Sequence, residues 1–185
     1  MAGRHGLKPG ITARALRLAR PVRLLVLDVD GVLTNNTVYV GGPGQDIKRF
    51  GIQDGMGIKL AQSVGIDVAV ISGLGNSQAE ARLRQLGVRE FHGGHLKKLP
   101  VLESLLAGKG LSLAQTAYMG DDWLDGPILA KVGLPMTVPG AQPEIVRLAA
   151  WMSRQPGGNG AVREAIRFLL LAQGKLEGVL KTWRD

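Results

Sequence analysis

Carboxylate side chains directly follow two short apolar segments of this sequence. The first segment ends in Asp28 and Asp30, and the second is followed by Asp121, Asp122 and Asp125. If these carboxylates converge, their like charges repel one another and are costly to bury unless a cation neutralises them. Oxygen donors without a histidine among them suit a hard ion, and magnesium is the expected one.

Ser72, Gly73 and Lys98 could add a phosphate site to these acids. Ser72 and Gly73 follow a third apolar segment, and Lys98 opens the helix expected after a fourth. A hydroxyl and backbone N–H groups at a strand end can hold a phosphate, and a lysine adds a point charge. In phosphoryl transfer an aspartate can attack phosphorus, and a second acid two residues on can protonate the leaving group and then activate water.

The elements that must position these residues alternate between strands and helices. This alternation predicts an α/β fold, with a Rossmann-like parallel sheet covered by helices on both faces. Ligands of such sheets bind beyond the carboxyl ends of the strands, so the polar clusters should meet at one edge. Strands are expected at 23–29, 66–71, 88–91, 116–119 and 134–138, and helices at 54–64, from Asn76 or Ser77 to Gly87, at 97–106, 143–150 and 161–173.

Two glycine-rich stretches predict turns. GGPGQ separates the segments 37–40 and 46–50, which indicates a β-hairpin. PGGNG at 156–160 predicts a flexible loop before the last helix, with a backbone able to approach a ligand closely.

Four of these features occur in the order of the four motifs of the haloacid dehalogenase superfamily. From residue 23 onward the chain also resembles the 3-deoxy-D-manno-octulosonate 8-phosphate phosphatase family. The resemblance implies a haloacid dehalogenase-like fold that is capless, with a small β-hairpin in place of a cap domain. It also implies a homotetramer in which a neighbour, through its tail, helps to close each site. The motifs are DVDGVLT (28–34), VISG (70–73), Lys98 and GDDWLD (120–125), and the family stretches are FGIQDGMGIKL (50–60), GDDWLDGPIL (120–129), PGGNGAVREA (156–165) and LLLAQGKLE (169–177).

The resemblance assigns roles by position. It makes Asp28 the nucleophile and Asp30 the general acid/base, and it places Mg²⁺ on Asp28, the Asp30 backbone carbonyl and Asp121. Ser72, Gly73 and Lys98 are expected to hold the phosphate. The other expected substrate contacts are Gly51, Ile52, Gln53, Asp54, Gly55, Lys59 and Arg82, although Asp54 could equally serve to start a helix.

Three positions depart from the family pattern. Leu74 and Asn159 stand where the family usually has arginines, and Asn35 lies in Thr-Asn-Asn where the family reads Ser-Asp-Gly. The expected function is hydrolysis of a phosphorylated sugar acid, 3-deoxy-D-manno-octulosonate 8-phosphate, in lipopolysaccharide precursor synthesis. The alternatives are another acid sugar phosphate, such as a sialic-type 9-phosphate, or a non-catalytic oligomerisation module. Because the departures spare the phosphoryl-transfer residues, the chemistry is better supported than the substrate.

The composition narrows the class of protein. A chain of 185 residues with 45% hydrophobic residues suits one globular domain. The absence of cysteine excludes disulfides, zinc–thiolate sites and a cysteine nucleophile. No apolar run approaches the roughly 20 residues of a membrane span, and the basic N-terminus lacks the apolar stretch of a signal peptide. A cytoplasmic protein without a membrane partner is expected.

The net charge of +8 comes mostly from the N-terminus. Six of the 23 Lys and Arg residues precede the first acidic residue, which leaves 17 basic against 15 acidic residues. This favours a basic N-terminal arm or helix at 1–22, a phosphatase domain at 23–175 and a C-terminal tail at 176–185. The arm could contact nucleic acid, but a solvated helix docked loosely through Ala15, Leu16 and Ala19 is favoured, so nucleic acid is an unlikely partner.

Several other side chains have two readings. His92 and His95 lie near the expected phosphate edge, where a loop role is favoured over a substrate contact because magnesium does not prefer histidine. Trp123 could line the cleft or pack, whereas Trp151 and Phe168 are expected in the core.

Overall fold

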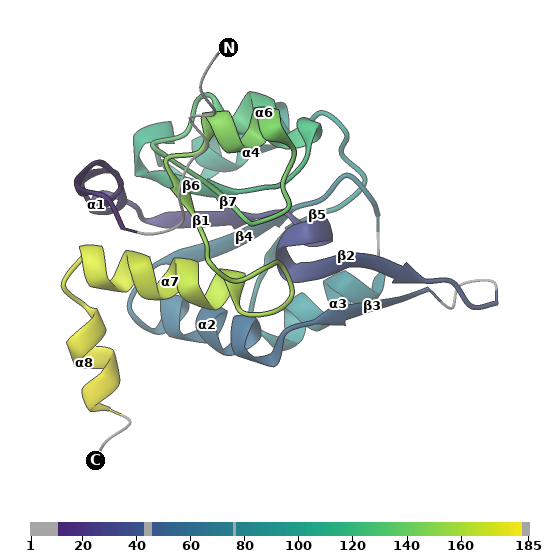
Figure 1. The fold of residues 1–185 in the computed structure, drawn as a ribbon, viewed down its shortest axis with the longest axis horizontal. Coiled ribbons are helices and arrows are strands. Elements are labelled where there is room, and N and C mark those ends of the chain that lie inside the picture. Colours follow the sequence, from purple (N-terminus) through teal and green to yellow (C-terminus); the bar gives the residue numbers. More distant parts are fainter. Residues whose placement is uncertain (1–10, 43–45, 76, 183–185) are drawn as a thin grey trace, which may run out of the picture.

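A six-stranded parallel sheet forms the centre of the molecule, with helices on both faces and a two-stranded hairpin projecting from it (Figure 1). The computed structural model describes residues 11–42, 46–75 and 77–182. The strand order is β5-β4-β1-β6-β7-β8. This arrangement confirms the Rossmann-like α/β fold expected from the sequence.

The sheet brings the ends of its central strands together. In the parallel register Leu27 of β1 pairs with Val70 of β4 on one side and with Met119 of β6 on the other. The residues that follow these three strands therefore meet at one edge of the sheet. The strands are β1 (Leu24–Leu27), β4 (Asp67–Ile71), β5 (Glu90–His92), β6 (Thr116–Met119), β7 (Leu134–Thr137) and β8 (Trp151–Met152), and the antiparallel hairpin pairs β2 (Thr34–Tyr39) with β3 (Ile47–Phe50).

The helices cover two separate apolar cores. Leu25 and Leu27 of β1 face one core, and Leu24 and Val26 face the other, which explains why the strand is apolar throughout. One face carries α1 (Ala13–Ala19), α2 (Ile52–Ser63), α3 (Ser77–Gln85) and α7 (Ala161–Ala172), the other carries α4 (Lys98–Lys109), α5 (Gly126–Leu129) and α6 (Pro143–Leu148), and α8 (Leu176–Lys181) follows α7.

The N-terminal helix packs more firmly than the sequence predicts. Ala15 and Ala19 of α1 are fully buried against α7, and the Gln173 side-chain amide donates hydrogen bonds to the carbonyl oxygens of Ala19 and Val22 at 3.2 and 2.7 Å. The boundary expected at residue 22 therefore lies inside a continuous core. The basic residues before position 11, Asn76 and the hairpin tip at 43–45 lie outside the described residues.

Two short elements were not expected from the sequence. Strand β8 has only two residues, and α8 falls in the segment expected to be a tail. Trp151 of β8 stacks on Phe168 of α7 with ring centroids 5.3 Å apart, which confirms both aromatic residues as core. None of the helices in the described part of the chain combines the length and the apolarity that a membrane crossing requires.

Candidate active site

Asp28 leaves β1 at the centre of the sheet edge. Its backbone N–H donates to the Met119 carbonyl at 3.0 Å, and one carboxylate oxygen accepts from the Val29 N–H at 2.7 Å. The chain then turns through the short helical segment η1 (Val29–Leu33), where Gly31 has a φ of +82°. A Cβ at Gly31 would overlap the Asp121 carboxylate, so the turn requires glycine for its conformation and for this approach.

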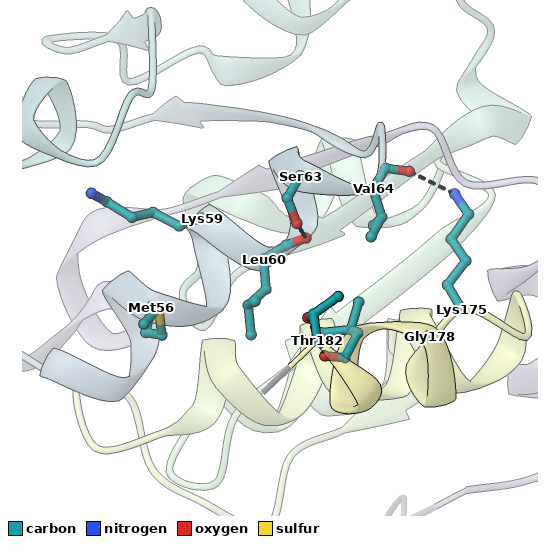
Figure 2. A pocket seen from close by; sticks show the side chains of 9 residues that line it. Met56, Lys59, Leu60, Ser63, Val64, Lys175, Gly178 and Thr182 are labelled. Carbon is teal, nitrogen blue, oxygen red and sulfur yellow. Dashed lines mark hydrogen bonds between the residues drawn. The ribbon is translucent and has the colours of Figure 1, made fainter. Parts of the chain in front are cut away.

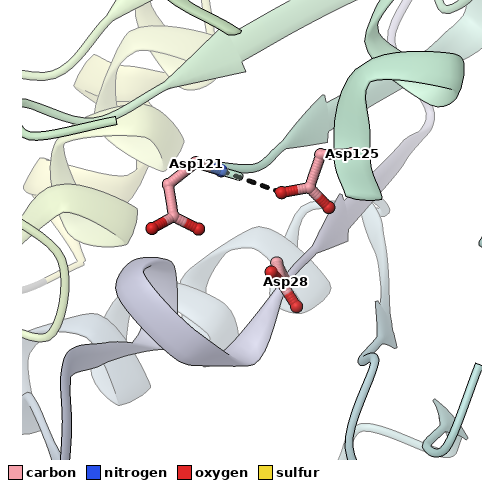
Figure 3. A group of neighbouring side chains, drawn as sticks. All are labelled: Asp28, Asp121 and Asp125. Carbon is pink, nitrogen blue, oxygen red and sulfur yellow. Dashed lines mark hydrogen bonds between the residues drawn. The ribbon is translucent and has the colours of Figure 1, made fainter. Parts of the chain in front are cut away.

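Three buried carboxylates converge at this edge. Asp28, Asp121 and Asp125 each offer an oxygen, and these oxygens lie within 4.8 Å of one another (Figure 3). Oxygen Oδ1 of Asp121 is buried and has no hydrogen-bond partner within the described residues. A buried acceptor without a partner is costly, and a hard divalent cation bound by carboxylate oxygens would satisfy it. The donor set therefore fits Mg²⁺.

The protonation of these acids reflects their crowding. Burial, with the charge of Asp125, raises the pKa of Asp28 to about 7 against the lowering effect of Lys98. Burial, with the charges of Asp28 and Asp125, raises the pKa of Asp121 to about 8. Further positive charge in the cluster, such as a divalent cation, would lower both pKa values and favour the ionised form of both acids.

Lys98 supplies positive charge from the first turn of α4. Its ammonium lies 2.9 Å from Asp28 and 2.7 Å from Asp125, and the side chain is 1% exposed. Burial favours the neutral amine, but the charges of Asp28 and Asp125 outweigh this effect and raise the pKa of Lys98. The lysine is therefore charged and directed at the expected phosphate position.

Asp125 organises the far side of the cluster. It is fully buried and accepts hydrogen bonds from the Tyr118 hydroxyl at 2.6 Å and from the backbone N–H groups of Asp121 and Asp122 at 2.9 and 3.1 Å. Tyr118 was not identified from the sequence. The available signal was a tyrosine in the middle of a buried strand, because a buried phenol usually needs a hydrogen-bond partner.

Asp30 has a partner from the hairpin. Lys48 of β3 is 3% exposed, and its ammonium lies 2.7 and 2.8 Å from the two carboxylate oxygens of Asp30. This lysine was not predicted from the sequence either. A lone lysine in a hairpin strand carries no signal until the strand's inner face is known.

A cleft of about 180 Å³ opens over these residues. It contains the expected site residues Asp28, Asp30, Gly73, Lys98 and Asp121. Ser72 is buried beneath it, and its hydroxyl accepts a hydrogen bond from the Leu74 N–H at 3.3 Å. The remaining lining residues are Asn36, Leu74, Leu96, Asp122 and Leu124.

Other expected substrate contacts lie elsewhere on this chain. Lys59 lines a groove of about 770 Å³ between α2 and α8, where Lys175 at the opposite end donates to the Val64 carbonyl (Figure 2). One Arg82 nitrogen packs over Gly55, 3.1 Å from where a Cβ would stand. Neither Lys59 nor Arg82 lines the cleft of its own chain, and their expected substrate contacts stay a prediction.

Residues 51–53 form another hollow, of about 700 Å³, together with the 156–160 loop. Its walls include Gly51, Ile52, Gln53 and Arg163. The hollow therefore adjoins the loop rather than the acid cluster.

Asp54 is a structural residue in this chain. It is 1% exposed, and its two oxygens accept from the backbone N–H groups of Gly160 and Arg163 at 3.0 and 2.9 Å. A carboxylate buried in this way holds the start of α7 and is not available to substrate. Of the two roles expected for Asp54, the structural one at the start of a helix fits this geometry, and the substrate contact stays a prediction.

The two histidines lie outside the cleft. His92 and His95 line a hollow of about 570 Å³ beside α4, together with Glu90 and Lys109. The His95 backbone N–H donates to the Ser72 carbonyl at 3.0 Å, which supports the preferred reading of a loop role.

The comparisons with known proteins place this geometry in context. No protein-family model matches the chain. It is 40% identical over 167 residues to the 3-deoxy-D-manno-octulosonate 8-phosphate phosphatase KdsC of Escherichia coli, covering 90% of this chain and 89% of the relative.

Two solved structures are similar over most of both chains. The 3-deoxy-D-manno-octulosonate 8-phosphate phosphatase from Yersinia pestis is 39% identical, covers 91% of each chain and superposes with a TM-score of 0.89. The enzyme of the same name from Moraxella catarrhalis, in complex with magnesium, phosphate and KDO, is 29% identical, covers 94% of this chain and 99% of its own, and has a TM-score of 0.91.

Proposed function

The chain belongs to the 3-deoxy-D-manno-octulosonate 8-phosphate phosphatase family, and on that premise we propose that it hydrolyses this sugar-acid phosphate with Mg²⁺. The reaction is the hydrolysis of a phosphate monoester, which releases phosphate and the free sugar acid, in lipopolysaccharide precursor synthesis. The observation that carries the proposal is the buried cluster of Asp28, Asp121 and Lys98 beneath a small cleft. A non-catalytic oligomerisation module would have no need of these costly buried charges.

In the proposed mechanism Asp28 attacks phosphorus and forms an aspartyl phosphate. Asp30, paired with Lys48, enters the first step as the protonated acid and gives its proton to the sugar oxygen as the bond between phosphorus and that oxygen breaks. In the second step the Asp30 carboxylate takes a proton from the water that attacks the aspartyl phosphate, which releases phosphate and restores Asp28. Lys98 and the backbone at Gly73 bind the phosphoryl oxygens. Mg²⁺ on Asp28, the Asp30 carbonyl and Asp121 would neutralise the charge that these oxygens share with the carboxylates.

The substrate assignment rests on family membership. Leu74, which replaces a family arginine, is 56% exposed on the rim of the cleft and offers no charge to a sugar acid. We therefore expect weaker binding than in relatives that keep the arginine, since a hydrogen bond to a charged group contributes roughly 1.5–3 kcal/mol.

A phosphate-release assay over a panel of sugar phosphates tests the proposal. The panel contains 3-deoxy-D-manno-octulosonate 8-phosphate, a sialic-type 9-phosphate and neutral sugar phosphates, each with and without Mg²⁺. The highest kcat/KM should fall on the 8-phosphate and should vanish without the metal. A higher kcat/KM on the 9-phosphate would show that the sialic-type acid phosphate is the substrate. Inactivity on every phosphate in the panel would favour the non-catalytic module.

The proposal includes a homotetramer located in the cytoplasm. The hairpin presents exposed apolar side chains, with Tyr39 and Ile47 directly paired across its strands and 55% and 64% exposed. An exposed apolar strand edge favours pairing with another chain, and a second copy would also cover the open cleft. Light scattering and cell fractionation test these two parts.

A further inference from the structure

The catalytic cleft shares its walls with a second hollow that leads away from the phosphate. Asn36 and Asp121 line both the cleft and this hollow, which measures about 300 Å³. The cleft alone, at about 180 Å³, is smaller than the roughly 300–1,000 Å³ of an ordinary small-molecule site. A substrate larger than its phosphate group must therefore extend beyond the cleft.

Arg49 of β3 is the one cation among the described residues that line the second hollow. One of its terminal nitrogens, Nη2, donates to the side-chain oxygen of Asn159 at 3.2 Å, and no carboxylate of the described residues pairs with it. The neighbouring Lys48 is paired with Asp30, and Lys98 is paired with Asp28 and Asp125. Arg49 therefore keeps guanidinium donors for a ligand.

The rest of the surroundings disfavour an anionic group. The opposite rim of the cleft is apolar, with Leu74, Leu96 and Leu124 exposed there. Asp30, Asp121 and Asp122 at the cleft would repel a carboxylate. Because Asp121 also lines the second hollow, an acid group at the far end of the substrate is favoured there only where a cation offsets this carboxylate.

We propose that Arg49 binds the carboxylate of the substrate at the end remote from the phosphate, and so makes the enzyme selective for phosphorylated acids. This inference rests on the proposed function. A guanidinium matches a carboxylate with two parallel hydrogen bonds, which a lysine cannot reproduce. Asn159 holds the guanidinium toward the hollow, and its loop is fixed because Gly157 packs directly on the Gly31 carbonyl oxygen.

The test compares Arg49→Gln with the intact protein on two substrates. One is 3-deoxy-D-manno-octulosonate 8-phosphate, and the other is p-nitrophenyl phosphate, which has no carboxylate. For the 8-phosphate, the variant should have a KM that is raised roughly 10- to 100-fold, because one charge-assisted contact is lost. Its kcat on this substrate should change by less than about twofold. Its kcat/KM on p-nitrophenyl phosphate should stay within about twofold. Arg49→Lys should restore part of the binding.

Arg167→Gln is the matched control. Arg167 is an exposed arginine that lines the hollow of about 700 Å³ but not the one of about 300 Å³, so both substrates should react as with the intact protein. Equal losses on both substrates for Arg49→Gln, or no loss on either, would overturn the carboxylate assignment while leaving the proposed function in place. If the intact protein hydrolyses p-nitrophenyl phosphate but no acid sugar phosphate, the proposed function and this inference both fail.

Discussion

At the scale of single residues, the site holds buried carboxylates that repel one another and that a cation would neutralise. Asp28, Asp121 and Asp125 lie within 4.8 Å of one another, and Lys98 is the one cation paired with them in the described chain. Burial, followed by the charges of the neighbouring aspartates, raises the pKa of Asp28 to about 7 and that of Asp121 to about 8.

This crowding predicts how stability depends on pH. An acid whose pKa is raised on folding binds its proton more tightly in the folded state. The free energy of unfolding of the metal-free protein should therefore fall as pH rises from the unfolded pKa of 3.8 toward about 8. Mg²⁺ should restore stability, and more strongly at pH 8 than at pH 6, because protons compete with the cation. Thermal unfolding in EDTA and in Mg²⁺ at several pH values measures both effects.

The control for this prediction is Asp121→Asn. This substitution removes one titrating carboxylate of the expected metal site. The free energy of unfolding of the metal-free variant should therefore fall less steeply as pH rises, and the stabilisation by Mg²⁺ should largely disappear. A stabilisation that is the same at pH 6 and pH 8, and that survives Asp121→Asn, would place the cation elsewhere.

Lys48 carries a second prediction at this scale. Lys48→Met removes the ion pair with Asp30, so a carboxyl that lines the cleft loses the charged partner that fixes its position. We expect kcat to fall at least tenfold, but by less than the roughly 10²–10⁴ that general acid–base help supplies. Steady-state kinetics measure the effect, with Lys131→Met at an exposed ion pair as control. Unchanged kcat would show that Asp30 needs no partner.

At the scale of elements, the start of α7 is tied to α2. Asp54 accepts both backbone N–H groups that fix the 156–160 loop to α7, and an Asn offers only one acceptor oxygen. Asp54→Asn should lower the free energy of unfolding by about 1–3 kcal/mol and speed hydrogen exchange around residues 157–163. Denaturant unfolding and exchange mass spectrometry measure these changes. Asp67→Asn, at an exposed carboxylate, is the control and should change the free energy of unfolding by less than about 0.5 kcal/mol. An equal effect of both substitutions would contradict the stabilising role of the hydrogen bonds to Asp54.

Most of the fold could be predicted from the sequence because its signals are local. The apolar strand at 24–27 and the strand at 116–119 are recognisable without partners, and so is the helix that tolerates Pro100 in its first turn. Strand β8 could not be predicted, because a two-residue strand has no period and exists only through its pairing with β7. The firm packing of α1 depends on contacts with α7, about 150 residues away in the chain.

Some residues of the candidate site could likewise be predicted from local sequence signals, whereas others depend on contacts between distant parts of the chain. Asp28, Lys98 and Asp121 could be placed because each follows or opens an element that the sequence reveals. The role of Asp54 could not be decided from the sequence because its partners, Gly160 and Arg163, come from the opposite end of the chain. Lys48 was missed for a similar reason, since the twist and register of the hairpin decide which side chains face Asp30.

At the scale of the whole molecule, the 156–160 loop packs beside the candidate site of its own chain. The Gly158 N–H donates to the Val32 carbonyl at 3.0 Å, so the 156–160 loop, expected to reach a neighbour, packs on the catalytic turn of the same chain. Helix α7 also contributes Val162, Ile166 and Leu169 to the core, so a chain truncated before Pro156 should not fold. In the proposed tetramer a neighbour would then act through another surface, and the hairpin is the candidate.

The hairpin prediction uses the exposed pair Tyr39 and Ile47. The double change Tyr39→Lys with Ile47→Lys should convert the proposed tetramer to smaller species, because charged edges resist pairing. We expect a lower mass in light scattering, a preserved thermal transition and a reduced kcat/KM from an uncovered cleft. Arg84→Glu on α3, at an exposed ion pair, is the control. A variant that keeps the assembly and the activity of the intact protein would rule out this surface.

The central claim is that Asp28 receives the phosphoryl group, and acid quenching during turnover tests it most directly. The protein is mixed with phosphorus-labelled 3-deoxy-D-manno-octulosonate 8-phosphate and Mg²⁺, quenched within milliseconds, digested and mapped by mass spectrometry. The label should appear on the peptide that contains Asp28, should decay as phosphate is released, and should be absent from Asp28→Asn, which should also show no turnover and an unchanged fold. A label on another residue, or near-normal turnover by Asp28→Asn, would contradict the account.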